Sequence, residues 1–392
     1  MDSRELSDTK NASQEASTAA PQGARSLRKK TVFALVMLAG LLGFVEAAFA
    51  AYYFLAVPRD QRYLVEATLG LRSSERNTVL RYRPHPYLNY VGNPDYVYPD
   101  GLRPYHEIGI RATDVPLTER RPGVLRIVAM GGSTTYGHAF REAKNVWPEI
   151  AGERLASSLG VEIDTINIGV INYTTFELLG LAMMWLPEFQ ADIVVVHTGL
   201  NDAFSVGFPD EGGLDNTSFR HSWAYTPVPG LARISMRLSY LIRVSGMRWL
   251  SEKGYMIGDM TPSMQYAVPA LNQVRENVRG ATGKYFRRNL ETLIVLIRRA
   301  GATPVLANMP LNPAMERGLG PYYDAVSQAV IRNNRIMAEV GEQEGVVVAD
   351  LFSRMRDSSV FLDAGHVNSR GMERKAQIIA EALEPIVSRE LQ

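Results

Sequence analysis

The chain of 392 residues contains no cysteine. This absence excludes disulfide bonds, thiolate metal sites, a lipid-modified N-terminal cysteine and a cysteine nucleophile. An excess of one charge is also missing, because 42 lysines and arginines are balanced by 41 aspartates and glutamates. Such a chain has no overall field that would attract a polyanion, and we expect no nucleic-acid partner. It also lacks an HExxH motif or a comparable ligand spacing, so we predict no metal and no cofactor.

The N-terminal region combines a polar lead with one long apolar stretch. Residues 1–30 are rich in Ser, Ala, Gln and Thr without an apolar period, which predicts a disordered cytoplasmic tail. Residues 31–57 are apolar except for Glu46 and exceed the roughly 20 residues that cross a bilayer. Basic residues are more numerous before this stretch than after it. We therefore expect a single-pass signal-anchor helix in a bacterial cytoplasmic (inner) membrane, with the rest of the chain on the extracytoplasmic, periplasmic side.

Two other interpretations of the apolar stretch compete with the anchor. Ala48-Phe49-Ala50 resembles a signal-peptidase site, so the segment could be a cleaved export signal. It could also be a buried helix of a soluble protein. The anchor is favoured because the polar lead is long and apolar residues continue beyond residue 50. Glu46 would be costly against lipid, so we expect it to pair with another helix or to be protonated.

The extracytoplasmic part divides into a neck and an alternating region. Residues 58–123 are rich in Pro, Tyr and Arg and show no clean period, which predicts a neck and an irregular segment that packs on the main domain. Their tyrosines could stack on a sugar, but ring burial against the domain is the favoured interpretation. From residue 124 strands alternate with helices, as in an α/β domain with a parallel sheet. Strands are expected at 124–130, 161–168, 193–197, 303–307 and 345–349. Helices are expected at 147–159, 174–189, 286–300, 324–344 and 372–387.

Residues 204–283 interrupt this alternation. Within them, apolar side chains of 231–250 fall on one helical face and arginines lie away from it, which predicts one basic amphipathic helix. It could be a lid over the site, a surface helix in contact with anionic lipid, or a helix that covers the sheet. The main domain is therefore expected over 124–392, with a lid-like insertion at about 204–283.

A glycine-rich turn directly follows the first expected strand of this domain. The segment GGSTTYG, residues 131–137, places Ser133 just past an apolar strand. Glycines permit a tight turn there, which exposes the serine hydroxyl at the edge of the sheet. A phosphate-binding loop is the alternative, but its lysine and the GxGxxG spacing are missing.

Polar residues follow the other strands at the same edge. Asn172 comes after the second strand, and Asn201 lies in GLND, residues 199–202, after the third. A serine nucleophile needs a base, and histidine is suited to that role. In DAGH, residues 363–366, Asp363 can hold the ring Nδ1–H of His366 and leave Nε2 for the serine.

These three blocks, in this order, resemble the Ser, Asn and Asp-x-x-His blocks of the SGNH hydrolases, which are GDSL-type esterases and lipases. The resemblance covers roughly residues 124–203 and 284–388. It implies a three-layer α/β/α, flavodoxin-like fold with a parallel five-stranded sheet. It also implies Ser133 as nucleophile, His366 as general base and acid, and Asp363 as the residue that orients the histidine.

The resemblance further implies an oxyanion hole made by the Ser133 N–H, the Asn201 side-chain amide and a backbone N–H after the second strand. Two positions depart from the family pattern. Gly132 stands where the family usually has aspartate. The expected glycine of the second block falls at Asn172, with Gly169 as an alternative register. Asparagine tolerates positive φ better than most residues, so its N–H can still point into the hole.

The chemistry implied by the resemblance is acyl transfer from an ester outside the membrane. The favoured function is a serine esterase that hydrolyses O-acetyl esters on a carbohydrate or cell-envelope glycan. Alternatives are an O-acetyltransferase with the same triad, a lipase or lysophospholipase, and a non-enzymatic glycan-binding assembly subunit. The expected partners are an ester-bearing small molecule or glycan and the membrane through residues 31–57. The residues identify no protein partner.

Two further polar residues near these blocks have ordinary structural interpretations. His197, inside the apolar third strand, is expected to be a hydrogen-bonded core residue. Asp202 is expected to cap or brace its own turn.

Overall fold

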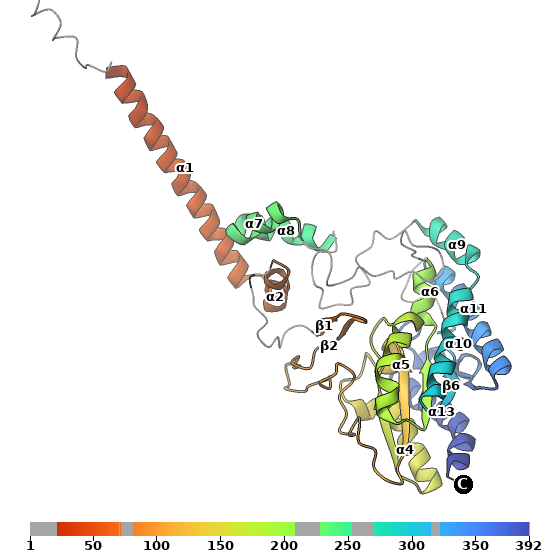
Figure 1. Ribbon diagram of the computed structural model, residues 1–392. Helices are drawn as coiled ribbons and strands as arrows, with labels where there is room; N and C mark the ends of the chain where they lie inside the picture. The colour runs from red at the N-terminus through yellow and green to blue at the C-terminus, as the bar shows by residue number, and fades with distance from the viewer. Residues whose placement is uncertain are drawn as a thin grey trace, which may run out of the picture. The chain divides into compact units, whose positions relative to one another are not determined.

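The chain forms two compact units. The computed structural model describes residues 22–69, 71, 81–207, 228–252, 270–314 and 322–391. One unit combines residues 1–58 with residues 230–247, and the other combines residues 59–229 with residues 248–392. The first unit is therefore made of two separate segments of the chain. The second unit contains the five-stranded sheet (Figure 1).

Helix α1 (Gln22–Leu55) is the first element of the chain. It begins at Gln22 rather than at residue 31, so part of the predicted disordered tail is helical. The good helix formers Ala24, Arg25 and Leu27 explain this extension, since a helix propagates into such residues at little cost. The remainder of the tail prediction falls outside the described residues. Ser26–Leu55 is long and apolar enough to cross a membrane as an anchor, or to serve as a signal sequence.

The second unit is built on a five-stranded parallel sheet with strand order β4-β3-β5-β6-β7. This order is that of flavodoxin-like sheets, so the predicted fold class is confirmed. The predicted bounds hold for β5 and β6, whereas β4 and β7 are shorter than predicted. The strands are β3 (Leu125–Gly131), β4 (Ile163–Asn167), β5 (Ile193–His197), β6 (Thr303–Ala307) and β7 (Val347–Ala349).

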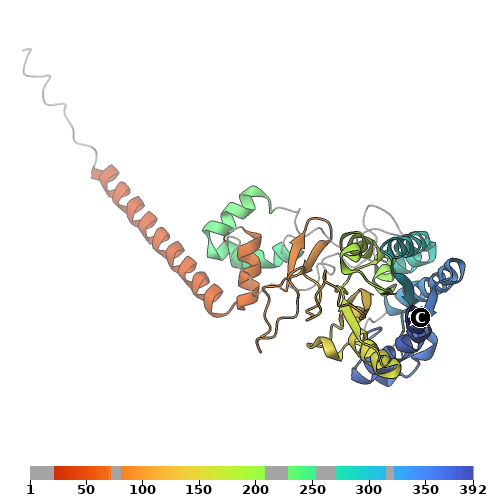
Figure 2. The same ribbon diagram turned by 60° about the horizontal axis from the view of Figure 1, so that its bottom comes forward.

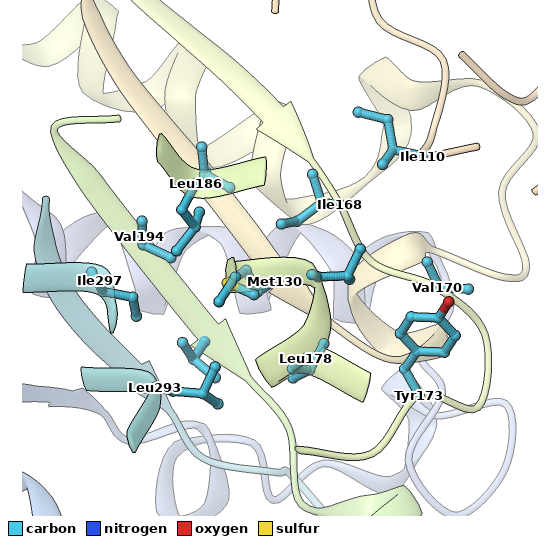
Figure 3. Close-up of a cluster of buried hydrophobic side chains, with 14 of the residues drawn as sticks. Ile110, Met130, Ile168, Val170, Tyr173, Leu178, Leu186, Val194, Leu293 and Ile297 are labelled. Carbon is cyan, nitrogen blue, oxygen red and sulfur yellow. The ribbon is translucent and has the colours of Figure 1, made fainter. Parts of the chain in front are cut away.

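Helices cover both faces of the sheet because successive strand side chains alternate between the faces. Ile127 and Ala129 belong to a buried cluster with α4 and α13, whereas Val128 and Met130 belong to one with α5, α10 and α11. Figure 3 shows Met130 of β3 among side chains from α5 and α10 in the second cluster. The helices are α4 (Trp147–Leu159), α13 (Ser369–Glu390), α5 (Thr175–Phe189), α10 (Lys284–Arg299) and α11 (Tyr322–Glu344).

Shorter elements complete this unit. Helix α5 begins with a capping box between Thr174 and Glu177. Helix α9, from the expected insertion, packs with α6 and α11 in a third apolar cluster. The shorter elements are α2 (Arg59–Thr68), β1 (Tyr82–His85), β2 (Asn89–Gly92), α3 (Ser133–Tyr136), α6 (Leu200–Gly207), α9 (Leu271–Gly280) and α12 (Leu351–Arg354), with 3-10 helices at Ala143–Asn145 and Ser358–Val360.

The neck is more regular than its sequence predicts. It contains helix α2 and the antiparallel hairpin β1–β2. Packing between tyrosines explains the hairpin, because Tyr82 and Tyr90 are buried with ring centroids 5.3 Å apart. Tyr105 joins them, so ring burial is confirmed for these three tyrosines, whereas Tyr87 is 82% exposed and does not fit that interpretation.

The amphipathic segment 231–250 is two helices rather than the one predicted, and it begins in the unit of α1. Helix α7 (Gly230–Leu238) ends before Ser239, and α8 (Tyr240–Glu252) begins after it. The carboxylate of Glu46 accepts hydrogen bonds from the Ser239 hydroxyl and from the Tyr240 N–H. The start of α8 is thus stabilised by a residue far away in sequence, which a local pattern does not reveal.

A buried arginine stabilises the end of the sheet that lies opposite the glycine-rich turn. Arg126 of β3 is inaccessible to solvent, and its guanidinium lies 3.3 Å from the Asp164 carboxylate. It also donates to the carbonyl oxygens of Pro116, Leu117, Glu119 and Phe189.

We predict that Arg126→Met lowers the free energy of unfolding by about 3–5 kcal/mol, because it leaves several buried carbonyls without their donor and removes one of the two arginines paired with the buried Asp164 carboxylate. Urea denaturation followed by circular dichroism measures this loss. The control is Arg120→Met, which removes a partly exposed ion pair with Asp192 and should cost less than about 1 kcal/mol. Equal losses in the two variants would contradict the prediction.

Candidate active site

The turn between β3 and α3 has close contacts at two successive glycines. A Cβ at Gly131 would lie 2.2 Å from the His197 carbonyl oxygen, and one at Gly132 would lie 2.5 Å from the Asn201 side-chain nitrogen. Both distances are shorter than real Cβ contacts. The obstacle at Gly131 is backbone, whereas the obstacle at Gly132 is the end of the Asn201 side chain, which a larger residue would displace. Ser133 follows as the first residue of α3 and is 5% exposed.

The structure brings Ser133, His366 and Asp363 together although the serine and the histidine are 233 positions apart. The Ser133 Oγ lies 2.7 Å from His366 Nε2, and His366 Nδ1 lies 2.8 Å from the Asp363 carboxylate. These contacts form one continuous line of hydrogen bonds from hydroxyl to carboxylate.

The charge state of Asp363 determines the direction of these hydrogen bonds. Burial alone would raise its pKa, but the hydrogen bond and charge of His366 and two backbone N–H donors lower the pKa to about 2. The carboxylate is therefore ionised near neutral pH and can only accept, so Nδ1 of His366 carries the proton. In the neutral imidazole Nε2 is then the acceptor, and the Ser133 hydroxyl donates to it. This arrangement suits removal of the serine proton by the ring.

The loop that carries Asp363 and His366 is closed by its own backbone. Phe361 and Val367 form an antiparallel bridge, and the Leu362 N–H donates to the His366 carbonyl oxygen at 2.8 Å. The loop after β6 also stabilises this histidine loop, because the Asn312 side chain donates to the Asp363 carbonyl oxygen at 3.2 Å. The histidine is thus placed by the loop after β6 as well as by its own turn.

The side-chain amide of Asn201 lies against the serine turn. It donates to the Tyr173 carbonyl oxygen at 2.8 Å and lies next to Gly132. Asn172 has φ of 63°, the left-handed conformation that the sequence allowed at this position. The N–H of Gly169, the alternative register, donates to the Asn167 side chain at 3.0 Å. Asn172 stays the predicted second-loop residue.

Asp202 braces more than its own turn. Its carboxylate accepts from the backbone N–H and hydroxyl of Thr175, at 3.0 and 2.6 Å, and from the Thr198 hydroxyl at 3.3 Å. These bonds join the start of α6, which carries Asn201, to the start of α5, which follows Asn172. Burial raises the pKa of Asp202 to about 6, although the Thr175 hydrogen bonds act in the opposite direction.

Two buried basic residues lie directly behind the serine turn. His197 is inaccessible and hydrogen-bonds to the Ala307 carbonyl through Nδ1, as expected for a core histidine. Its Nε2 lies 3.2 Å from Nζ of Lys375, which also contacts the Thr134 carbonyl oxygen. Burial lowers the pKa of Lys375 to about 7. Sequence reasoning missed Lys375, although its position between Met372 and Ile379 on the apolar stripe of the last helix was a signal.

Residues of the neck donate hydrogen bonds to two segments of the site, the segment around α3 and the loop of Asn172. The Arg111 guanidinium donates to the carbonyl oxygen of Tyr136, the last residue of α3, and to those of Phe140 and Arg141. The Tyr90 hydroxyl donates to the Ile171 carbonyl oxygen at 2.6 Å, next to Asn172. Sequence reasoning missed both roles, because nothing local to Arg111 or Tyr90 indicates their distant partners.

Small pockets flank the serine on both sides. One is lined by Ser133, His138 and His366, and another by Ser133, Asn201 and Met309. The rings of His138 and His366 are 5.8 Å apart. Burial, and to a smaller extent the charge of His366, lowers the pKa of His138.

Within the described ranges, no group of three or more histidine and acidic side chains could hold a metal ion.

The sequence pattern of the GDSL-like lipase/acylhydrolase family matches residues 129–374, which is more than half of the chain. The matched region includes Ser133, Asn172, Asn201, Asp363 and His366. Among curated proteins, none matches this sequence.

Solved structures of similar proteins align with about two thirds of the chain at low identity. One is a lipolytic protein of the G-D-S-L family from Veillonella parvula, with 13% identity, a TM-score of 0.39 and coverage of 66% of this chain and 97% of that chain. A lipase/acylhydrolase from Enterococcus faecalis has 18% identity, a TM-score of 0.38 and coverage of 67% and 96%. A psychrotrophic esterase from Pseudoalteromonas sp. has 12% identity, a TM-score of 0.39 and coverage of 67% and 98%.

We predict that Gly132→Ala displaces the Asn201 amide, because the new Cβ would lie 2.5 Å from its nitrogen. If that amide stabilises the oxyanion, kcat for ester hydrolysis falls by about 10²- to 10³-fold. Asn201→Ala should cause a similar loss, and the double variant should be little worse than either single one, since all three remove the same donor. Losses that multiply in the double variant would show that the two positions act independently.

We also predict a pH-dependent stability difference between the wild type and Asp202→Asn. Between pH about 4 and 6 the folded wild type keeps a proton on Asp202 that the unfolded chain has released. The free energy of unfolding of the wild type should therefore fall, relative to that of the variant, as pH rises through this window. Above pH about 6 the difference should be constant. Urea denaturation at several pH values measures it, and a difference independent of pH between 4 and 6 would be the contrary result.

Proposed function

The chain belongs to the GDSL-like lipase/acylhydrolase family and is thus an ester-hydrolysing enzyme, and from this premise we propose that it removes short acyl groups, above all O-acetyl groups, from a carbohydrate or cell-envelope glycan outside the cytoplasmic membrane. The observation that carries the catalytic part of the proposal is the 2.7 Å contact between Ser133 Oγ and His366 Nε2. A serine nucleophile is activated when its hydroxyl hydrogen-bonds to a base and a carboxylate orients that base.

In the proposed reaction, Ser133 Oγ attacks the ester carbonyl carbon while His366 Nε2 takes the hydroxyl proton. The tetrahedral intermediate collapses, the bond to the alcohol breaks, and His366 gives the proton to the leaving oxygen. Water then attacks the acyl-serine, with His366 again as the base, and releases the acid and the free serine. Asp363 keeps the ring in the required tautomer and stabilises the imidazolium.

The proposed oxyanion hole combines the N–H of Ser133, the N–H of Asn172 and the side-chain amide of Asn201. Support comes from the positive φ of Asn172 and from the position of Asn201 beside Gly132. Donors fixed before the reaction stabilise the developing charge without reorganisation. The bonds from Asp202 to Thr175, and from Tyr90 to Ile171, provide this rigidity.

The lining of the two pockets beside Ser133 supports a short acyl group. Both pockets are narrow, and polar side chains form part of their walls, His138 and His366 on one side and Asn201 on the other. A long acyl chain needs a continuous apolar channel, and neither pocket forms one among the described residues. The lining therefore favours O-acetyl esters over the lipid substrates of a lipase.

We predict that the detergent-solubilised full chain hydrolyses aryl acetate faster than butyrate or dodecanoate, because the narrow, partly polar pockets beside Ser133 offer no apolar channel for a long chain. Ser133→Ala should lose activity on every ester and should no longer react with a fluorophosphonate probe. Asp363→Asn should lose up to about 10⁴-fold in kcat, because the ring is then held in the wrong tautomer.

Ser157→Ala, at an exposed serine of α4, is the control and should behave as the wild type. The catalytic assignment would be refuted by a probe that labels Ser133→Ala as well as the wild type. A preference for dodecanoate would refute the short-acyl proposal alone. With an O-acetylated glycan the esterase should release acetate faster than it transfers the group to a second sugar, whereas an acetyltransferase would do the reverse.

A further inference from the structure

The unit that contains α1 also holds the pair of helices α7 and α8. Both views of the chain show these helices beside the C-terminal half of α1 (Figures 1 and 2). The contact is specific, because Glu46 of α1 accepts the Tyr240 N–H at 2.8 Å and the Ser239 hydroxyl proton. The carboxylate thus stabilises the first turn of α8, where unpaired N–H groups and the helix dipole favour a negative charge.

An aromatic and cationic cluster completes this junction. The Tyr240 ring lies 5.6 Å from the rings of both Tyr53 and Phe54 of α1. The guanidinium of Arg243, which is buried, lies 4.5 Å from the Tyr240 ring centroid and 5.3 Å from that of Tyr53. Such contacts are worth more when they are desolvated.

The two helices are also fixed to each other. Arg243 donates to the carbonyl oxygens of Met236 and Arg237 at the end of α7. Gly246 of α8 permits close packing, since a Cβ there would lie 2.3 Å from the methyl group of Met236. Helices α1, α7 and α8 therefore form a packed junction with satisfied polar groups.

The outer side of α7 is apolar and unprotected. Leu231, Ile234 and Leu238, at positions i, i+3 and i+7, are 82%, 53% and 81% exposed. Arg233 and Arg237 are exposed beside them. An apolar stripe flanked by arginines is typical of helices that lie in the headgroup region of a bilayer with anionic lipids.

The position of the junction along α1 fits that region. If the hydrocarbon layer begins after Lys30, a rise of about 1.5 Å per residue places Glu46 about 22 Å and Tyr53 about 33 Å into the membrane. The hydrocarbon layer is about 30 Å thick, so Tyr53 falls at its far boundary, where tyrosine is enriched. Glu46 falls just inside, where an unpaired carboxylate would be costly. The N-terminus of α8 meets this need.

We propose that residues 230–247 form an interfacial element that is docked on α1 and inserts its stripe of Leu231, Ile234 and Leu238 into the outer leaflet of an anionic bilayer. The lipid-exposed surface of α1 and the stripe then form one apolar surface, and the arginines contact lipid phosphates. The proposal requires that α1 is retained, because cleavage after Ala50 would remove Glu46. It is independent of the substrate of the catalytic site.

The absence of cysteine allows a direct test with the full-length chain. Single variants Ile234→Cys and Leu238→Cys are labelled with a polarity-sensitive fluorophore and reconstituted in vesicles of phosphatidylcholine with phosphatidylglycerol. The matched control is Val295→Cys, at a 57% exposed position on α10 of the catalytic unit. Labels at 234 and 238 should emit at shorter wavelength and be quenched by spin-labelled lipids, whereas the label at 295 should respond to an aqueous quencher.

Two further variants test the basis of the contact. Glu46→Ala should remove the lipid quenching of the label at 238 while α1 stays inserted, because α8 loses its cap. Arg233→Gln combined with Arg237→Gln should abolish the difference between vesicles with and without the anionic lipid. Circular dichroism verifies that both variants remain folded.

Aqueous accessibility at 234 and 238 equal to that at 295 would overturn the proposal. Burial of these labels in detergent that increases with protein concentration would also overturn it, because a second copy of the chain would then cover the stripe. Release of α1 by signal peptidase from the purified membrane form would refute it as well.

Discussion

The close backbone approach at the end of β3 is the constraint on which the site depends. Parallel register sets Gly131 opposite His197, so β3 and β5 end at the same level. The turn after β3 then passes so near to β5 that Gly131 has no room for a side chain, and a side chain at Gly132 would displace the Asn201 amide. Ser133 and Asn201 become neighbours because the adjacent strands β3 and β5 end at the same level and the turn after β3 carries no side chain at Gly131 and Gly132.

Much of this arrangement could be predicted from sequence because it follows from local patterns. Strand β5 is apolar throughout, since helices cover both of its faces, and its bounds were predicted correctly. The grouping of Ser133 with Asn201 follows from topology, because the carboxyl ends of parallel strands meet at one edge. The contact of His366 with Ser133 was expected from the resemblance, whereas the support that the histidine loop receives from Asn312, after β6, could not be predicted.

The features that were missed depend on partners far away in sequence. The break between α7 and α8 at Ser239 is set by Glu46, and no pattern within 231–250 contains that information. Arg111 and Tyr90 precede the region that matches the family, yet they hold the carbonyl groups around α3 and the loop of Asn172. The rigidity of the two loops therefore depends partly on a segment that lies outside the matched region.

The pairing of Glu46 with Ser239 also bears on how the chain is made. The two residues are separated by 193 positions. At a synthesis rate of about 5–20 residues per second, Ser239 leaves the ribosome roughly 10–40 s after Glu46. In the proposed membrane unit α1 must therefore wait in or near the translocation channel with an unmatched carboxylate until its partner helix has been exported. Completion of the junction becomes a late step of biogenesis, and a chain that ends before Ser239 would leave the Glu46 carboxylate without these two donors.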